Sequence, residues 1–143
     1  MSNASKPARP LPQPDSYVPT APFWEAARQG QLVLQYCRDS QQFQHYPRPV
    51  SRYTGSRNLE WRPVSGNGVV YAHTVMRVPM RGFEDRVPYI VAIVELQERV
   101  RLLANLVNCR PEDVRIGMPV QLCWERLSEN INYPNFEPAR DPK

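Results

Sequence analysis

The sequence has few of the side chains on which most enzymes and disulfide-stabilised proteins depend. Its 143 residues include three cysteines, Cys37, Cys109 and Cys123, and two histidines, His45 and His73. An odd number of widely spaced cysteines argues against a disulfide framework and is typical of reduced thiols in the cytoplasm. Neither histidine lies in a Ser/Cys/His/Asp pattern that would pair a nucleophile with its base. We therefore expect a cytoplasmic protein with no catalytic residues of its own.

Long apolar runs and lysine are also scarce. No apolar stretch approaches the roughly 20 residues that a membrane-spanning helix needs, and no signal-peptide pattern opens the sequence. The sequence contains sixteen arginines but only two lysines, and its formal net charge is +4. Guanidinium groups form planar, bidentate hydrogen bonds with phosphate and carboxylate groups. The excess of arginine over lysine therefore favours an anionic partner such as a nucleotide, a nucleic acid or an acidic protein surface. An ordinary solvated surface explains the arginines equally well.

The first half of the chain divides into an arm and a small module. Prolines crowd residues 1–19, which we predict to be an extended arm. Thr20 can cap a short helix that ends before Gly30, and this helix must dock because it is too short to be stable alone. The alternating pattern of residues 31–37 then indicates a half-buried strand. The docking helix and a strand-rich module thus occupy residues 20–64.

Residues 65–128 have the pattern of a small β-barrel. The breaker Ser65-Gly66-Asn67-Gly68 marks its start. Four or five strands, with one helical turn before the last, fit a Greek-key barrel better than a sandwich. Residues 129–143 are expected to be a C-terminal tail. The strands are predicted at residues 69–78, 89–96, 100–107 and 120–126.

Two short segments have the spacing of metal-binding knuckles. Cys37 and Ser40 form the first pair, and Ser51 and Thr54 form the second, about a dozen residues later. A zinc ribbon needs four thiolate or imidazole ligands in this frame, and Cys37 alone is of that kind. Neutral hydroxyls bind zinc poorly, so we expect no metal here. Packing of Tyr36, Phe43, Tyr46 and Tyr53 would have to hold the module together.

Several segments between residues 22 and 137, in order and with compatible spacing, resemble the family catalogued as domain of unknown function 35. The resemblance implies a mainly β fold: a short N-terminal helix, a rubredoxin-like zinc-ribbon hairpin and a five-stranded OB-fold barrel. Family members usually carry four cysteines at the two knuckles, whereas this chain keeps one, so the hairpin is expected without metal. The segments are FWEAARQGQL at 23–32, YPRPV at 46–50, GS at 55–56, LEW at 59–61, SGNGVVYAHTV at 65–75, PYIVA at 88–92 and IGMPV at 116–120.

The same resemblance implies a partner enzyme. Such proteins assemble with thiolases, thiolase-like aldolases, ketoacyl-synthase-like enzymes or MaoC-type hydratases, and the partner carries the catalytic residues. The chain is therefore expected to be a non-catalytic accessory subunit of an acyl-CoA thiolase or aldolase complex, as a heterotetramer that holds or guides the CoA thioester. It would bind no cofactor of its own.

Candidate contact residues follow from this expectation. Aromatic residues dominate binding hot spots, so Phe23, Trp24 and Tyr46 are candidates for the partner surface. Phe23 and Trp24 could equally serve only to fix the helix to its own module. The candidates for contact with CoA or the substrate are Arg48, His73, Arg77, Arg81 and Phe83, any of which could instead be ordinary solvated side chains.

Two other functions are compatible with the sequence. An OB-fold can bind single-stranded nucleic acid on aromatic side chains, for which Tyr71, His73, Phe83 and Tyr89 are available. The small net charge and the near absence of lysine disfavour this alternative. An independent hydratase or thioesterase is disfavoured by the sparse set of histidines.

Overall fold

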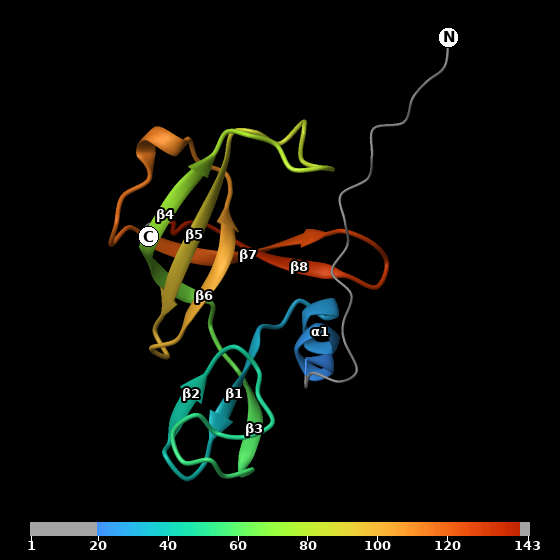
Figure 1. Cartoon of the computed structure of the whole chain (residues 1–143), viewed down its shortest axis with the longest axis vertical. Coiled ribbons are helices and arrows are strands. Elements are labelled where there is room, and N and C mark those ends of the chain that lie inside the picture. Colours follow the sequence, from blue (N-terminus) through green and yellow to red (C-terminus); the bar gives the residue numbers. More distant parts are fainter. Residues whose placement is uncertain (1–19, 141–143) are drawn as a thin grey trace.

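A computed structural model describes residues 20–140, which form one short helix, a three-stranded sheet and a closed five-stranded barrel (Figure 1). The predicted arm, residues 1–19, lies outside the described residues. No helix within residues 20–140 is long and apolar enough to cross a membrane.

The small module is a helix followed by a three-stranded ribbon. Helix α1 (Ala21–Arg28) carries Pro22 in its first turn, where a missing N–H costs no hydrogen bond. The ribbon sheet has the order β2-β1-β3, and both neighbours run antiparallel to β1. Its strands are β1 (Val33–Cys37), β2 (Gln42–Gln44) and β3 (Leu59–Pro63).

The large module is a closed barrel with the strand order β4-β5-β6-β8-β7. Together with the single helix, this confirms the predicted mainly β fold with a five-stranded barrel. A short 3-10 turn, Pro111–Asp113, precedes β7, as the sequence pattern predicted. The strands are β4 (Asn67–Met76), β5 (Tyr89–Leu96), β6 (Arg101–Leu106), β7 (Pro119–Arg126) and β8 (Asn132–Pro138).

The last strand, β8, corrects the expectation that residues 129–143 form a tail. It pairs with β7 along its whole length and meets β6 at Leu106 and Phe136. Pro134 and Pro138 hide it in the sequence because proline cannot donate to a strand ladder. The strand tolerates the two prolines because it is paired along its whole length only with β7. Toward β6 it has one residue pair, Leu106 with Phe136, so few ladder hydrogen bonds are needed on that side. Phe136, which is fully buried, holds it in the barrel wall.

The two modules share one hydrophobic core. Alternate residues of β5, from Ile90 to Leu96, point inward and are buried, as the two-residue period of a strand requires. Leu32 and Leu34 of the ribbon belong to the same buried cluster. Gly66 at the junction is buried at φ +80°, and a Cβ there would lie 2.5 Å from Cβ of Leu122. The breaker at this point is therefore both a turn and a site of close packing.

Candidate functional site

The two knuckles meet, as their spacing predicts. The thiol of Cys37 is buried, and its Sγ lies 3.8 Å from Oγ1 of Thr54. The backbone N–H of Ser40 donates to the same sulfur at 3.4 Å. Ser51 Oγ accepts the backbone N–H groups of Tyr53 and Thr54 at 3.1 and 3.3 Å. The four frame positions thus form one cluster at the end of the ribbon.

This cluster does not fit zinc. Its donors are one thiol and three neutral hydroxyls, whereas a structural zinc site takes four thiolate or imidazole ligands. Within residues 20–140 no group of three or more His, Cys, Asp or Glu side chains could hold a metal ion. The polar surroundings of the thiol, chiefly the neighbouring hydroxyls of Ser40 and Ser51, instead favour the thiolate and lower the pKa of Cys37 to about 6.

Two buried glutamines connect the knuckle loops to the ribbon sheet. Gln44 Nε2 donates to Gln35 Oε1 at 2.8 Å and to the Val50 carbonyl at 3.3 Å, and its Oε1 accepts the Arg52 N–H at 2.9 Å. Gln35 pairs with both backbone groups of Arg48, accepting its N–H at 2.8 Å and donating to its carbonyl oxygen at 2.9 Å. The sequence does not reveal this network, because nothing in a sequence distinguishes a buried glutamine from a surface one.

The three predicted partner-binding residues lie at the joint between the modules. Phe23 packs against the core, edge-on to Trp24 with ring centroids 5.2 Å apart, and Trp24 stacks on Tyr133 of β8 at 6.1 Å. Tyr46 is 54% exposed, and its hydroxyl accepts the Leu103 N–H at 3.1 Å. Phe23 and Trp24 thus have structural contacts within the chain, whereas Tyr46 also offers a large free surface. Partner binding by these residues stays a prediction.

The predicted CoA-contact residues fall into two places. Arg48 is exposed on the ribbon. His73 on β4, together with Arg77 and Arg81 in the loop that follows it, is exposed at the barrel. Phe83, in the same loop, is half-buried and borders a cavity. The structure therefore separates Arg48 from the other four, and contact with CoA stays a prediction for all five.

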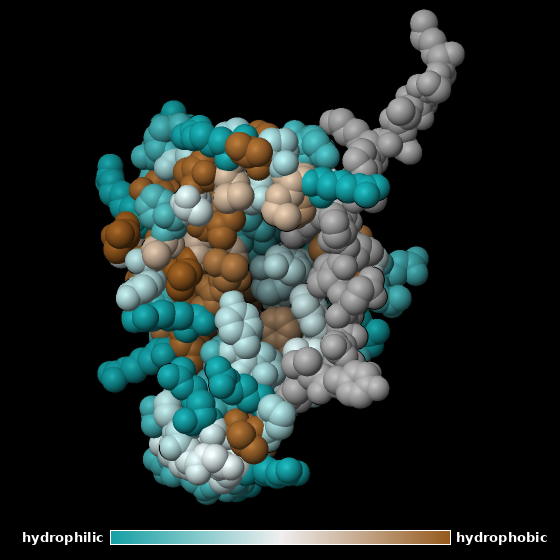
Figure 2. Space-filling view, in the orientation of Figure 1, coloured by the Kyte–Doolittle hydropathy of each residue, from teal (hydrophilic) through white to brown (hydrophobic). Residues whose placement is uncertain are grey.

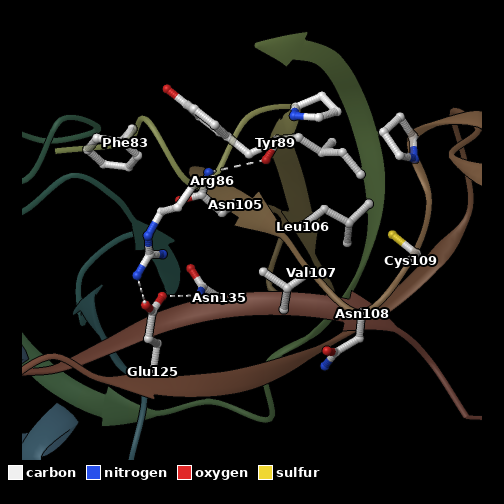
Figure 3. Close-up of a pocket in the computed structure, with 13 residues that line it drawn as sticks. Phe83, Arg86, Tyr89, Asn105, Leu106, Val107, Asn108, Cys109, Glu125 and Asn135 are labelled. Carbon is white, nitrogen blue, oxygen red and sulfur yellow. Dashed lines mark hydrogen bonds and ion pairs between the residues drawn. The ribbon is translucent and has the colours of Figure 1, made fainter. Parts of the chain in front are cut away.

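The cavity beside Phe83 is polar on one side and apolar on the other (Figure 3). Its volume is about 290 Å³. The polar side includes an ion pair between Arg86 and Glu125, with Nη2 and Oε1 2.7 Å apart, and the amide of Asn135. These residues escaped sequence analysis because Arg86 and Glu125 are 39 positions apart and β8 was not recognised as a strand. The apolar side includes Pro88, Ile90, Leu106, Val107 and Pro111.

The outer surface differs between the modules. Figure 2 shows hydrophobic side chains gathered over barrel strands β4–β6, whereas the ribbon is mostly hydrophilic on this side. Several large apolar side chains contribute to the surface of the barrel. They include Tyr71, Val78, Met80, Leu103 and Ile116.

Comparison with known proteins identifies the family. Two family models match: the rubredoxin-like zinc ribbon domain of ChsH2 over residues 24–60, and the C-terminal OB-fold domain of ChsH2 over residues 61–125. The solved structure of an Ltp2-ChsH2(DUF35) aldolase covers 91% of this chain and 98% of its own chain, with 36% sequence identity and a TM-score of 0.78. The chain belongs to the DUF35 family. This confirms the resemblance that the ordered sequence segments indicated.

The curated relatives carry two kinds of name, hydratase alpha subunit and DUF35 domain-containing scaffold protein. A probable enoyl-CoA hydratase alpha subunit from Thermomonospora curvata is 38% identical over 135 residues, which is 94% of this chain and 42% of the relative. A DUF35 domain-containing scaffold protein from Methanocaldococcus jannaschii is 43% identical over 67 residues, which is 47% of this chain and 48% of the relative. The chain thus spans less than half of the length of these two relatives.

Proposed function

We propose that this DUF35 chain is a non-catalytic accessory subunit of an acyl-CoA enzyme complex of the thiolase or thiolase-like aldolase type. In this proposal it helps to assemble the enzyme and to hold or guide the CoA thioester, and the partner carries out the reaction. The observation that carries the proposal is the match with the DUF35 chain of the aldolase structure, which extends over nearly the whole of both chains.

The joint between the modules supports a docking role. Tyr46 projects from the ribbon onto the barrel and is 54% exposed. A large, anchored aromatic side chain loses little conformational freedom when a partner covers it, which is why such residues dominate interface energetics. The apolar surface over β4–β6 would further favour association (Figure 2).

A hydratase is the second candidate for the partner. Two relatives that are similar over most of this chain are named as hydratase alpha subunits, one from Thermomonospora curvata and one from Mycobacterium tuberculosis. This chain would have the same non-catalytic role, and its partner would catalyse hydration in place of a thiolase or aldolase reaction. Nucleic-acid binding is less well supported, because Arg101 covers the ring of Tyr71, with its guanidinium carbon 3.6 Å from the ring centroid.

The test is co-purification of the tagged chain with thiolase-like and hydratase-like proteins of its own organism. We expect a stable complex that contains both chains, and turnover of the CoA ester by the complex but not by the isolated chain. Aldol cleavage and hydration assays then distinguish the two partner classes. Turnover by the isolated chain, or the failure of both partners to bind, would contradict the proposal.

A matched pair of variants tests the docking surface. Replacing Tyr46 with alanine should weaken the complex roughly tenfold, a loss that corresponds to one moderate hot spot. The control is Tyr53→Ala, which removes a second exposed tyrosine of the ribbon. Both variants should retain their thermal unfolding transition. Equal weakening by the two would show that Tyr46 is not a partner contact.

A further inference from the structure

The cavity in Figure 3 exists because two barrel strands separate. Strand β8 follows β7 over seven residue pairs, but it pairs with β6 at a single position, Leu106 with Phe136. The barrel wall therefore opens beyond this pair, and the opening is bordered by the loop that carries Phe83 and Arg86. Its volume of about 290 Å³ is close to the lower limit for small-molecule sites, which suits one segment of a longer ligand.

A buried hydrogen-bond acceptor lies at this opening. Asn135 is 3% exposed and donates from Nδ2 to Oε2 of Glu125 at 3.0 Å. Because a carboxylate only accepts hydrogen bonds, this contact fixes the amide orientation and turns Oδ1 away from Glu125. In Figure 3 this oxygen points from Asn135 toward the side on which Arg86 and Asn105 lie. Oδ1 accepts no hydrogen bond from any residue between positions 20 and 140. A buried acceptor without a donor is unfavourable, so a donor supplied by a ligand would stabilise this site.

The remaining groups define the ligand. Arg86 and Glu125 neutralise each other, so the polar side carries no net charge and does not favour a phosphate or a free carboxylate. One terminal nitrogen of the Arg86 guanidinium is bonded to Glu125, and its other N–H groups can donate to a carbonyl oxygen. Opposite them, Leu106 and Val107 offer an apolar wall. An acceptor, a donor and an apolar wall together match a secondary amide on an aliphatic chain.

We propose that this cavity binds a neutral aliphatic chain through a secondary amide, whose N–H is donated to Oδ1 of Asn135 and whose carbonyl oxygen faces Arg86. The chain packs against Leu106 and Val107. The pantetheine arm of a CoA thioester has this chemistry, and in naming it as the source the inference rests on the proposed function. The phosphates and the adenosine of CoA would lie outside the cavity.

The test uses the isolated chain and two small ligands of nearly equal shape, N-butylacetamide and butyl acetate, which differ in the replacement of N–H by oxygen. Each is titrated while amide NMR signals are followed, and pantetheine is titrated in a third experiment. We expect N-butylacetamide and pantetheine to shift the signals of Leu106, Val107 and Asn135. Butyl acetate should bind at least about tenfold more weakly, since it leaves Oδ1 of Asn135 without a donor. Equal binding of the amide and the ester, or shifts confined to other residues, would overturn the proposal.

A matched pair of variants tests the location. Val107→Phe should fill the cavity and abolish amide binding, whereas Val78→Phe makes the same change at a side chain that is 78% exposed and should leave binding unchanged. The comparison of amide and ester in the native chain holds even where Val107→Phe fails to fold. Absence of amide binding by the native chain, together with an intact enzyme complex, would refute the cavity site alone. Amide binding without any enzyme complex would refute the proposed function alone.

Discussion

Replacing Gln44 with leucine tests whether buried hydrogen bonds stabilise the ribbon where zinc ligands are missing. Leucine has nearly the same size but removes three hydrogen bonds, to Gln35, Val50 and Arg52, whose lengths lie between 2.8 and 3.3 Å. Each is worth about 1 kcal/mol net, and the stranded Arg52 N–H adds a desolvation penalty. The apolar leucine offsets part of this loss. We therefore expect the free energy of unfolding to fall by about 3 kcal/mol, a large share of the roughly 5–15 kcal/mol that stabilises a domain.

The measurement is urea unfolding followed by circular dichroism, together with amide hydrogen exchange. Exchange should accelerate at Arg52 and remain slow in β5 if the ribbon opens before the barrel. The control is Gln42→Leu, the same change at the exposed start of β2, which should alter stability by less than about 0.5 kcal/mol. A Gln44→Leu variant as stable as this control, with unchanged exchange at Arg52, would refute the claim that the network holds the knuckle loops.

Three further predictions concern pH and metal. Burial lowers the pKa of His45 from its usual 6.5 to about 4, so the unfolded state binds more protons between these values. Stability should fall by up to about 3 kcal/mol as the pH drops through that range, and the loss should vanish in His45→Phe; an unchanged loss in urea titrations of the variant would contradict this. Hydrogen bonds lower the pKa of Cys37 from 9.0 to about 6, so stability should rise with pH between these values, and a flat profile would show that the thiolate is not favoured in the folded state. A chelator should leave the thermal unfolding midpoint unchanged, because the knuckle cluster does not fit zinc; stoichiometric zinc in elemental analysis would disprove this.

Much of the fold could be predicted from local patterns. The two-residue period predicted the β1 segment, and the apolar run that starts at Tyr89 predicted the buried strand β5. The glycine-containing turn at residues 65–68 lies at the start of β4, which begins at Asn67. These signals are readable because backbone conformation and the alternation of side chains depend mainly on neighbouring residues. The knuckle frame was readable for the same reason, since its two pairs have fixed local spacing.

The strand β8 and the cavity were not predictable in this way. Two prolines obscure the period of β8, and its place depends on burial of Phe136 and on pairing with β7. The role of Asn135 follows from its position beside Glu125, which no local pattern encodes. Of the candidates for contact with CoA, Phe83 alone borders the cavity, because a long loop carries it back over the barrel.

The sequence alone determined that this chain is a mainly β protein with a ribbon, a barrel and a knuckle frame unsuited to zinc. These properties follow from residue types and short-range spacing, which need no knowledge of distant contacts. Tertiary structure decided that β8 completes the barrel and that two glutamines hold the knuckle loops. It also decided that Oδ1 of Asn135 is buried without a hydrogen-bond donor at the opening between β6 and β8. Each of these depends on residues far apart in the chain that meet only when folding buries them together.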